Sequence, residues 1–296
     1  MKVPNRLKSE LFLVLATLLW GGTFAIIKTG LNDCSPILFV AIRFFLAFLF
    51  FLPLIIRKCS ELSPGIWKAG AVLGVTMFAG YGLLTAGLGI TTTGRSGLIS
   101  YGYALFVPPL QILLLKKKVQ VVNIPGLLLA LLGMFIFTSP GASGSSGWNR
   151  GDTLTFLAAV SYAFNIIFLD KYTRIHDPGI LTGIQFAVMA LCAGFYVLFF
   201  ETPFLVVTGS FLFSLLYLTV FGSVAAIFIM NRYQKGTTPV RAVVIYALEP
   251  VLAVISGWLF LGEKLGISGI AGGSIIIAGV VLSEIPGLYA ARNRRS

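Results

Sequence analysis

Charged residues are scarce in this chain of 296 residues, because Asp, Glu, Lys and Arg make up only 11% of it, against about 25% in ordinary soluble domains. Hydrophobic residues make up 57%, and the mean hydropathy is +0.94. Apolar runs of about 20 residues, long enough to cross the hydrocarbon core of a bilayer, recur along the chain. The composition excludes a soluble globular protein and predicts an all-α polytopic membrane protein.

Histidine and cysteine are also scarce. The single histidine is His176, and the three cysteines, Cys34, Cys59 and Cys192, form no CxxC pair. This spacing gives no support for a disulfide framework or a cysteine metal site. The chain contains no HExxH motif and no GxxxxGKS or GxxxxGKT motif, which excludes a zincin-type protease and an ATP-binding loop. We therefore predict that the chain is not an enzyme and that it uses no metal and no cofactor.

Hydropathy predicts ten membrane-spanning helices, which we number as spans 1 to 10. They cover residues 10–30, 36–56, 67–89, 94–115, 121–138, 152–170, 178–200, 210–231, 240–261 and 265–285. The first run is preceded by basic residues, as in a signal peptide, but no convincing small-residue cleavage site follows it. We therefore expect span 1 to be retained.

The basic residues are distributed unevenly between the loops. With the N-terminus in the cytoplasm, cytoplasmic segments hold 17 of the 22 Lys and Arg residues, and four lie on the outer side. Loops rich in Lys and Arg stay in the cytoplasm. The sequence therefore predicts a multi-pass protein of the cell (inner) membrane with both termini cytoplasmic. The net charge of +12 is then a topology signal, so we expect a lipid bilayer around the chain and no nucleic acid as partner. It gives no prediction of oligomeric state.

An internal repeat links the two halves of the chain. Residues 139–151 read SPGASGSSGWNRG, which is typical of a flexible linker, and five spans lie on each side of it. Matching residues recur at a nearly constant separation. At 146 residues, Thr91–Arg95 matches Thr237–Arg241, Gly126 matches Gly272, and Gly133 matches Gly279; at 142 residues, Trp20 matches Tyr162 and Arg43 matches Gln185. We predict a first repeat over 1–138, a linker over 139–151 and a second repeat over 152–296.

An odd number of spans in each repeat has a topological consequence, because the second repeat must enter the membrane from the opposite face. Inverted repeats are common in secondary transporters, which place the substrate site near the bilayer midplane between the two halves. The sequence therefore predicts ten transmembrane helices as two inverted five-helix repeats around a central cavity.

Several short motifs together resemble the EamA-type carriers of the drug/metabolite transporter superfamily. They are Leu19–Phe24 with Lys28 in span 1, Pro36 followed by Arg43 in span 2, Leu248–Val251 followed by Leu261–Lys264 in span 9, and Gly272 to Gly279 in span 10. The resemblance covers nearly the whole chain. It implies a central cavity lined by spans 1, 3, 4, 6, 8 and 9 and the export of amino acids or related metabolites.

One departure from that pattern lies at the end of span 4. The family often repeats a Pro…Gly-Glu pattern there, whereas this chain has Pro108-Pro109 followed by Lys116-Lys117-Lys118. This departure leaves open whether the two repeats have the same structure at this turn.

Glu249 is the sharpest candidate for function. It lies nine residues into a span, roughly 14 Å deep, where an ionisable group costs at least about 2.5 kcal/mol and usually faces a cavity or a partner. It is either a proton-coupling or amine-binding carboxylate, or a structural acid beside the kink made by Pro250. Arg43 in span 2 is a structural or ion-pair candidate; it could bind a substrate carboxylate, pair with Glu249, or snorkel.

Aromatic and polar residues recur in the spans expected to line the cavity. The candidates for substrate binding are Trp20, Tyr81, Tyr101, Tyr162, Asn165 and Tyr246. Aromatic faces can hold a cationic amine or an apolar body, while the polar tips orient it. The alternative is that these residues serve packing or contact lipid.

The sequence favours a secondary active transporter of a small-molecule substrate. We expect alternating access, export of amino acids or related small metabolites, and proton coupling as a further possibility. Two alternatives stay open, namely import of a nucleoside-like or cationic metabolite and a non-transporting membrane receptor or assembly subunit. The short loops argue against the second alternative.

Overall fold

A computed structural model describes residues 5–119, 121, 124–137, 148–263 and 266–292. The elements of this part of the chain are helical, and no strand longer than an isolated bridge occurs in it. Among the described residues, eight helical stretches are long and apolar enough to cross a membrane, and two further apolar helices are shorter, Ile124–Ile136 and Ile270–Gly279. The structure confirms the predicted all-α polytopic fold.

The helices follow the predicted spans closely. The first five spans consist of α1 (Arg6–Gly21) with α2 (Thr23–Gly30), α3 (Pro36–Arg57), α4 (Pro64–Leu88), α5 (Thr93–Ser100) with α6 (Tyr103–Leu115), and α7 (Ile124–Phe137). The second five consist of α8 (Arg150–Tyr172), α9 (Pro178–Phe200), α10 (Gly209–Tyr217) with η3 (Leu218–Ala225) and α11 (Ala226–Tyr233), α12 (Pro239–Tyr246) with α13 (Leu248–Leu261), and α14 (Ile267–Arg292). Span 1 begins four residues earlier than expected. Residues 139–147 of the predicted linker lie outside the described residues.

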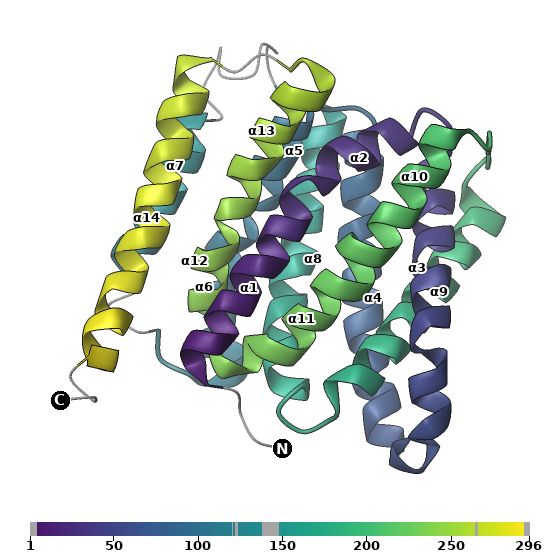
Figure 1. The fold of residues 1–296 in the computed structure, drawn as a ribbon, viewed down its shortest axis with the longest axis horizontal. Coiled ribbons are helices and arrows are strands. Elements are labelled where there is room, and N and C mark those ends of the chain that lie inside the picture. Colours follow the sequence, from purple (N-terminus) through teal and green to yellow (C-terminus); the bar gives the residue numbers. More distant parts are fainter. Residues whose placement is uncertain (1–4, 120, 122–123, 138–147, 264–265, 293–296) are drawn as a thin grey trace.

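The spans alternate in direction between two ends of the bundle (Figure 1). The start of α1 and the end of α14 lie at one end, which we call the termini end, and the starts of α5 and α8 lie at the opposite end. The first helix of each half therefore enters the bundle from a different end, as inverted repeats require.

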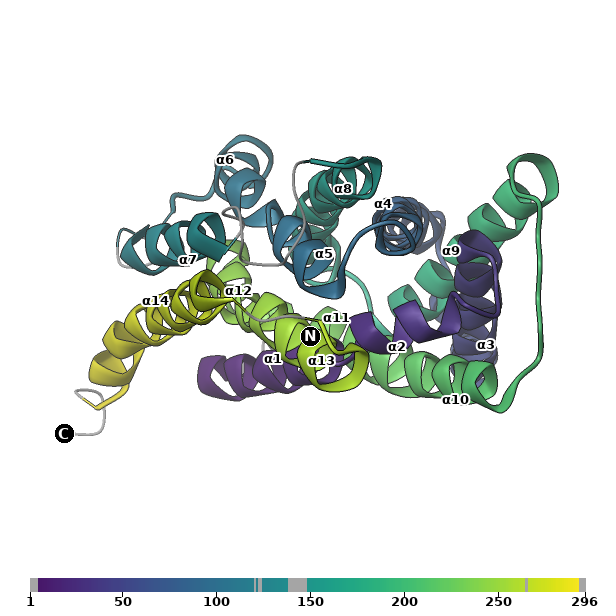
Figure 2. The ribbon, with the colours of Figure 1, turned by 90° about the horizontal axis from the view of Figure 1, so that it is seen from above.

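The fifth span of each repeat packs against its counterpart. Helices α7 and α14 lie side by side at one edge of the bundle (Figure 2). A methyl group added to Gly133 would lie 2.6 Å from the carbonyl oxygen of Gly272, and one added to Gly279 would lie 2.7 Å from that of Gly126. Glycine is required at these points because the two backbones touch. The four repeat-matched glycines of the sequence thus form one interface.

Three spans are interrupted near their middle. Span 1 breaks at Gly22, span 4 breaks at Tyr101 and Gly102, and span 9 breaks at Ala247. The breaks in spans 4 and 9 fall at positions separated by the repeat offset of 146. Such discontinuous helices free backbone groups and create space at the centre of a membrane protein. Span 8 also departs from an α-helix, because its middle third, η3, is a π-helix, a rare element found mostly at functional sites.

The turns that end spans 4 and 9 share a left-handed backbone. Lys116 caps α6 with a φ of 52°, and Gly262, which is 146 residues later, caps α13 with a φ of 66°. The two repeats therefore share the backbone of this turn and differ only in its side chains. Glycine suits the conformation, whereas a lysine in it costs about 1–2 kcal/mol, since its Cβ approaches the following carbonyl oxygen.

Replacing Lys116 by glycine is therefore expected to stabilise the protein. We expect Lys116→Gly to raise the free energy of unfolding by about 1 kcal/mol and Gly262→Ala to lower it by a similar amount. Unfolding of the purified protein in mixed detergent micelles measures both. Equal stability of Lys116→Gly and the parent would show that the lysine is not strained.

Candidate functional site

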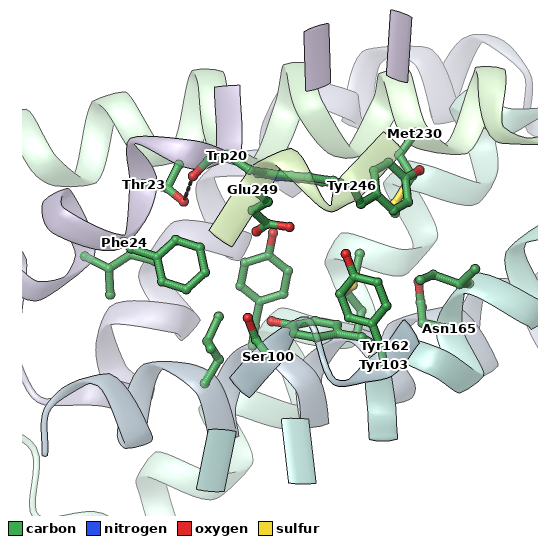
Figure 3. A pocket seen from close by; sticks show the side chains of 15 residues that line it. Trp20, Thr23, Phe24, Ser100, Tyr103, Tyr162, Asn165, Met230, Tyr246 and Glu249 are labelled. Atoms are coloured by element: carbon green, nitrogen blue, oxygen red, sulfur yellow. Dashed lines mark hydrogen bonds between the residues drawn. The ribbon is translucent and has the colours of Figure 1, made fainter. Parts of the chain in front are cut away.

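A cavity of about 60 Å³ lies at the centre of the bundle, next to the interrupted helices. Figure 3 shows the side chains around it. They are Trp20, Thr23, Phe24, Ile27, Met77, Tyr81, Leu84, Ser100, Tyr103, Tyr162, Asn165, Ile166, Met230, Tyr246 and Glu249. They come from spans 1, 3, 4, 6, 8 and 9, the same six spans that the family resemblance implies.

Trp20 joins span 1 to spans 8 and 9. Its indole Nε1 donates a hydrogen bond of 3.0 Å to the carbonyl oxygen of Gly222, which the π-helix makes available to a side chain. Its ring meets that of Tyr246 edge to face, with 5.9 Å between centroids. The Tyr246 hydroxyl in turn donates to Oε1 of Gln234 at 3.1 Å. Two of the predicted cavity residues are thus held in fixed orientations on one wall.

The facing wall comes from spans 3 and 6. Tyr81 and Tyr162 meet edge to face at 5.8 Å between centroids. The Asn165 amide donates to the carbonyl oxygen of Leu73 at 3.0 Å and to the Thr76 hydroxyl at 2.9 Å, which ties span 6 to span 3. Tyr81, Tyr162 and Asn165 all line the cavity. Whether they bind a substrate stays a prediction.

Glu249 follows the break in span 9, and its carboxylate points into the cavity (Figure 3). The side chain is half-buried, and among the described residues it makes no hydrogen bond or ion pair. A carboxylate in such surroundings is costly while charged and unpaired. It can therefore take up a proton, or it can pair with a cationic group that enters the cavity.

The structure places Tyr101 differently from the prediction. It lies at the break between α5 and α6, only 1% of its surface is exposed, and its hydroxyl donates to the carbonyl oxygen of Val243 at 3.2 Å. It does not line the cavity; Tyr103, two residues later, does. The sequence has no proline at the break between α5 and α6, since Pro108 and Pro109 lie inside α6.

Arg43 lies behind the cavity wall rather than in it. The side chain is 2% exposed, its Nε donates to the Ser223 hydroxyl at 2.7 Å, and its guanidinium stacks on the rings of Phe44 and Tyr81 at 5.2 and 5.1 Å. No ion pair joins it to Glu249 among the described residues. In this structure Arg43 ties span 2 to the π-helix and supports Tyr81.

The residues that line the cavity occur in repeat-related pairs. Trp20 corresponds to Tyr162 and Thr23 to Asn165 at the offset of 142, while Ser100 corresponds to Tyr246 and Tyr103 to Glu249 at the offset of 146. Three of these residues, Thr23, Ser100 and Tyr103, are not among the candidates predicted from the sequence. The repeat offsets, applied to the predicted residues in the other half, would have found all three.

Neighbouring cysteines test the orientation of span 4. In a chain lacking Cys34, Cys59 and Cys192, we expect a membrane-impermeant thiol reagent to label Ser100→Cys, which faces the cavity, and not Tyr101→Cys, which faces span 9.

Removing Cys34 does not remove a reactive group, because burial, with the charges of Glu201 and Asp33, raises the pKa of this thiol to about 12 and keeps it unreactive. Labelling of Tyr101→Cys alone would contradict the structure.

Comparison with known proteins agrees with this geometry. The model of the EamA-like transporter family matches residues 7–139 and 149–285. An uncharacterized transporter of Archaeoglobus fulgidus is 32% identical over 95% of this chain and 87% of its own length. The uncharacterized transporter YoaV of Bacillus subtilis is 28% identical over 93% of this chain and 96% of its own length. A solved structure that is 18% identical superposes with a TM-score of 0.76 and covers 98% of this chain and 99% of that chain.

Fold, cavity and relatives together define a multi-pass membrane transporter. More specifically, the chain belongs to the EamA-like transporter family.

Proposed function

We propose that this protein is a secondary active transporter that exports amino acids or related small metabolites by alternating access. The observation that carries the proposal is the central cavity, which lies between two inverted repeats and beside three interrupted helices. At about 60 Å³ it is much smaller than the roughly 300–1,000 Å³ of ordinary ligand pockets. The helices around the cavity must therefore move apart before a metabolite fits into it.

The lining supports a substrate that carries an amine on a partly apolar body. Trp20, Tyr81, Tyr103, Tyr162 and Tyr246 offer aromatic faces, which attract cations and pack against apolar groups. Glu249 adds a carboxylate without a partner among the described residues. An ammonium group of the substrate would supply that partner.

The direction of insertion is proposed from the charges. The termini end of the bundle carries most of the Lys and Arg residues, so we assign it to the cytoplasm by the positive-inside rule. The opposite end then faces outward across the cell (inner) membrane. This orientation leaves the cavity to be loaded from the cytoplasm during export.

Metabolite profiling tests the proposal. Cells that produce the chain are compared with cells that produce Ser100→Trp, in which the indole should fill the cavity, at matched amounts of protein in the membrane. Export predicts that one class of amine metabolite rises in the medium and falls in the cells only with the parent chain. The reverse change would indicate an importer. Identical profiles would favour a receptor or assembly subunit that transports nothing.

A further inference from the structure

Ion pairs at the two ends of the bundle are related by the internal repeat. At the opposite end Arg95 pairs with Asp152, which also accepts from the Thr91 hydroxyl at 2.8 Å. At the termini end Arg241 pairs with Glu10, which also accepts from the Thr237 hydroxyl at 3.3 Å. The arginines and threonines are 146 residues apart, and the acids are 142 apart. One arrangement therefore occurs twice, once at each end.

A second set of ion pairs follows the same offsets with the charges exchanged. Lys28 lies 3.7 Å from Glu263 at the opposite end, and Lys117 pairs with Asp170 at the termini end. Lys28 corresponds to Asp170 and Lys117 to Glu263. The four pairs join span 1 to span 9 at both ends and span 4 to span 6 at both ends. Each of these two helix pairs is therefore tied at both of its ends.

The exchange of charge makes the junction between spans 4 and 9 different at the two ends. At the opposite end the Glu263 carboxylate accepts hydrogen bonds from the backbone N–H groups of Thr93 and Gly94 at 2.9 and 3.2 Å and from the Thr93 hydroxyl. A carboxylate at a helix N-terminus is favoured by the helix dipole. Through Lys28, the same carboxylate also holds span 1.

At the termini end the corresponding hydrogen bonds between spans 4 and 9 join neutral groups. Lys117 cannot accept a hydrogen bond from the N-terminus of α12, and the Gln111 amide oxygen accepts instead from the Val240 N–H at 3.3 Å. Nearer the helix breaks, the Tyr101 hydroxyl donates to Val243. Hydrogen bonds to an ionised group are roughly twice as strong as neutral ones. Separating spans 4 and 9 therefore costs more at the opposite end.

We propose that Glu263 is a latch that keeps the opposite end closed and biases the empty transporter toward the state that opens at the termini end. The inference deepens the proposed function and rests on it, since a transporter that rests open to the cytoplasm is ready to load an export substrate. The opposite end opens when spans 4 and 9 separate and the hydrogen bonds of Glu263 to Thr93 and Gly94 break. The free energy of the Glu263 contacts, relative to that of the Gln111 contact with Val240, sets the populations of the state open at the termini end and the state open at the opposite end.

Cysteine accessibility tests the latch without a known substrate. The reporter is Ser100→Cys in the chain lacking native cysteines, labelled with an impermeant maleimide in intact cells and in inside-out vesicles. We expect Glu263→Gln to raise the ratio of external to internal labelling rates about tenfold, which corresponds to about 1.4 kcal/mol. The matched control is Lys117→Gln at the repeat-related position, where the ratio should stay the same. Gln111→Ala should lower it.

Two outcomes would overturn the latch. One is an unchanged ratio in Glu263→Gln, and the other is an equal change in Lys117→Gln. If Glu263→Gln does not accumulate in the membrane, Thr93→Val decides, because it removes one donor to the carboxylate and should raise the ratio to a smaller extent. A reporter that stays unlabelled from both sides in every variant would instead refute the cavity, and with it both the proposed function and the latch. A normal ratio shift without any metabolite export would leave the latch standing and refute the export function alone.

Discussion

Glu249→Gln is expected to abolish concentrative transport while leaving exchange of substrate measurable, at a lower affinity for a substrate that carries an ammonium group. The amide keeps the size of the side chain and its place in the cavity but cannot take up or release a proton. If Glu249 couples transport to protons, the variant loses the energy of the gradient and keeps the pathway. Proteoliposomes loaded with substrate, with and without an imposed pH gradient and membrane potential, measure both activities.

The energies are large enough to be observed. Moving one charge across 100 mV supplies about 2.3 kcal/mol, and a tenfold concentration ratio costs about 1.4 kcal/mol. One proton exchanged for one neutral substrate can therefore support a gradient of about 40-fold. Loss of coupling would reduce that ratio to one.

The repeat supplies a matched control. Tyr103 occupies the position in span 4 that corresponds to Glu249 in span 9, and it lines the same cavity. Tyr103→Phe removes a polar group from the cavity without removing a carboxylate, so it should still concentrate substrate. If Glu249→Gln concentrates substrate as well as the parent does, the carboxylate is structural and coupling must lie elsewhere.

Glu10→Gln is expected to destabilise the protein strongly. Glu10 is 7% exposed and its partner Arg241 is 1% exposed, so the substitution removes the negative charge from a buried ion pair. Breaking a buried pair in this way typically costs about 3–5 kcal/mol. Unfolding in mixed detergent micelles should show this loss as a lower midpoint.

Two further variants separate the buried pair from its surroundings. Arg6 also pairs with Glu10 but is 46% exposed, so Arg6→Gln should cost less than about 1 kcal/mol. The double variant Glu10→Leu with Arg241→Met replaces both charges by apolar groups and should regain most of the lost stability. A double variant as unstable as Glu10→Gln would show that the charge left behind is not the cause.

The sequence predicted the helices well because each span shows its own strong hydropathy. It also made Glu249 a candidate, since one carboxylate within a long apolar run is conspicuous; a role for it in transport stays a prediction. The bounds of α3 and α9 agree with the expected spans within a residue. The duplication was visible in the sequence because some matched residues, such as Gly133 and Gly279, touch the backbone of a neighbouring helix. A larger side chain does not fit there, so glycine occurs at the same position in both repeats.

The direction in which side chains point near the helix breaks could not be predicted from the sequence. Tyr101 and Tyr103 are both aromatic residues of span 4, and only the break between α5 and α6 decides that the second one reaches the cavity. The surroundings of Arg43 depend on a π-helix 180 residues away in the chain. Long-range contacts of this kind leave no periodic signal in the local sequence.

The left-handed turn shared by Lys116 and Gly262 has a consequence for how duplicated membrane proteins diverge. In the orientation proposed here, the two copies of this turn lie on opposite sides of the bilayer. During insertion the copy that stays in the cytoplasm is aided by lysines, and the copy that is translocated is not. Positive charge is therefore favoured at the copy of the turn that lies in the cytoplasm and disfavoured at the copy on the outer side, while both copies keep the same backbone. Positions at which the two repeats share a backbone conformation but differ in charge thus indicate which side of the membrane each repeat end occupies.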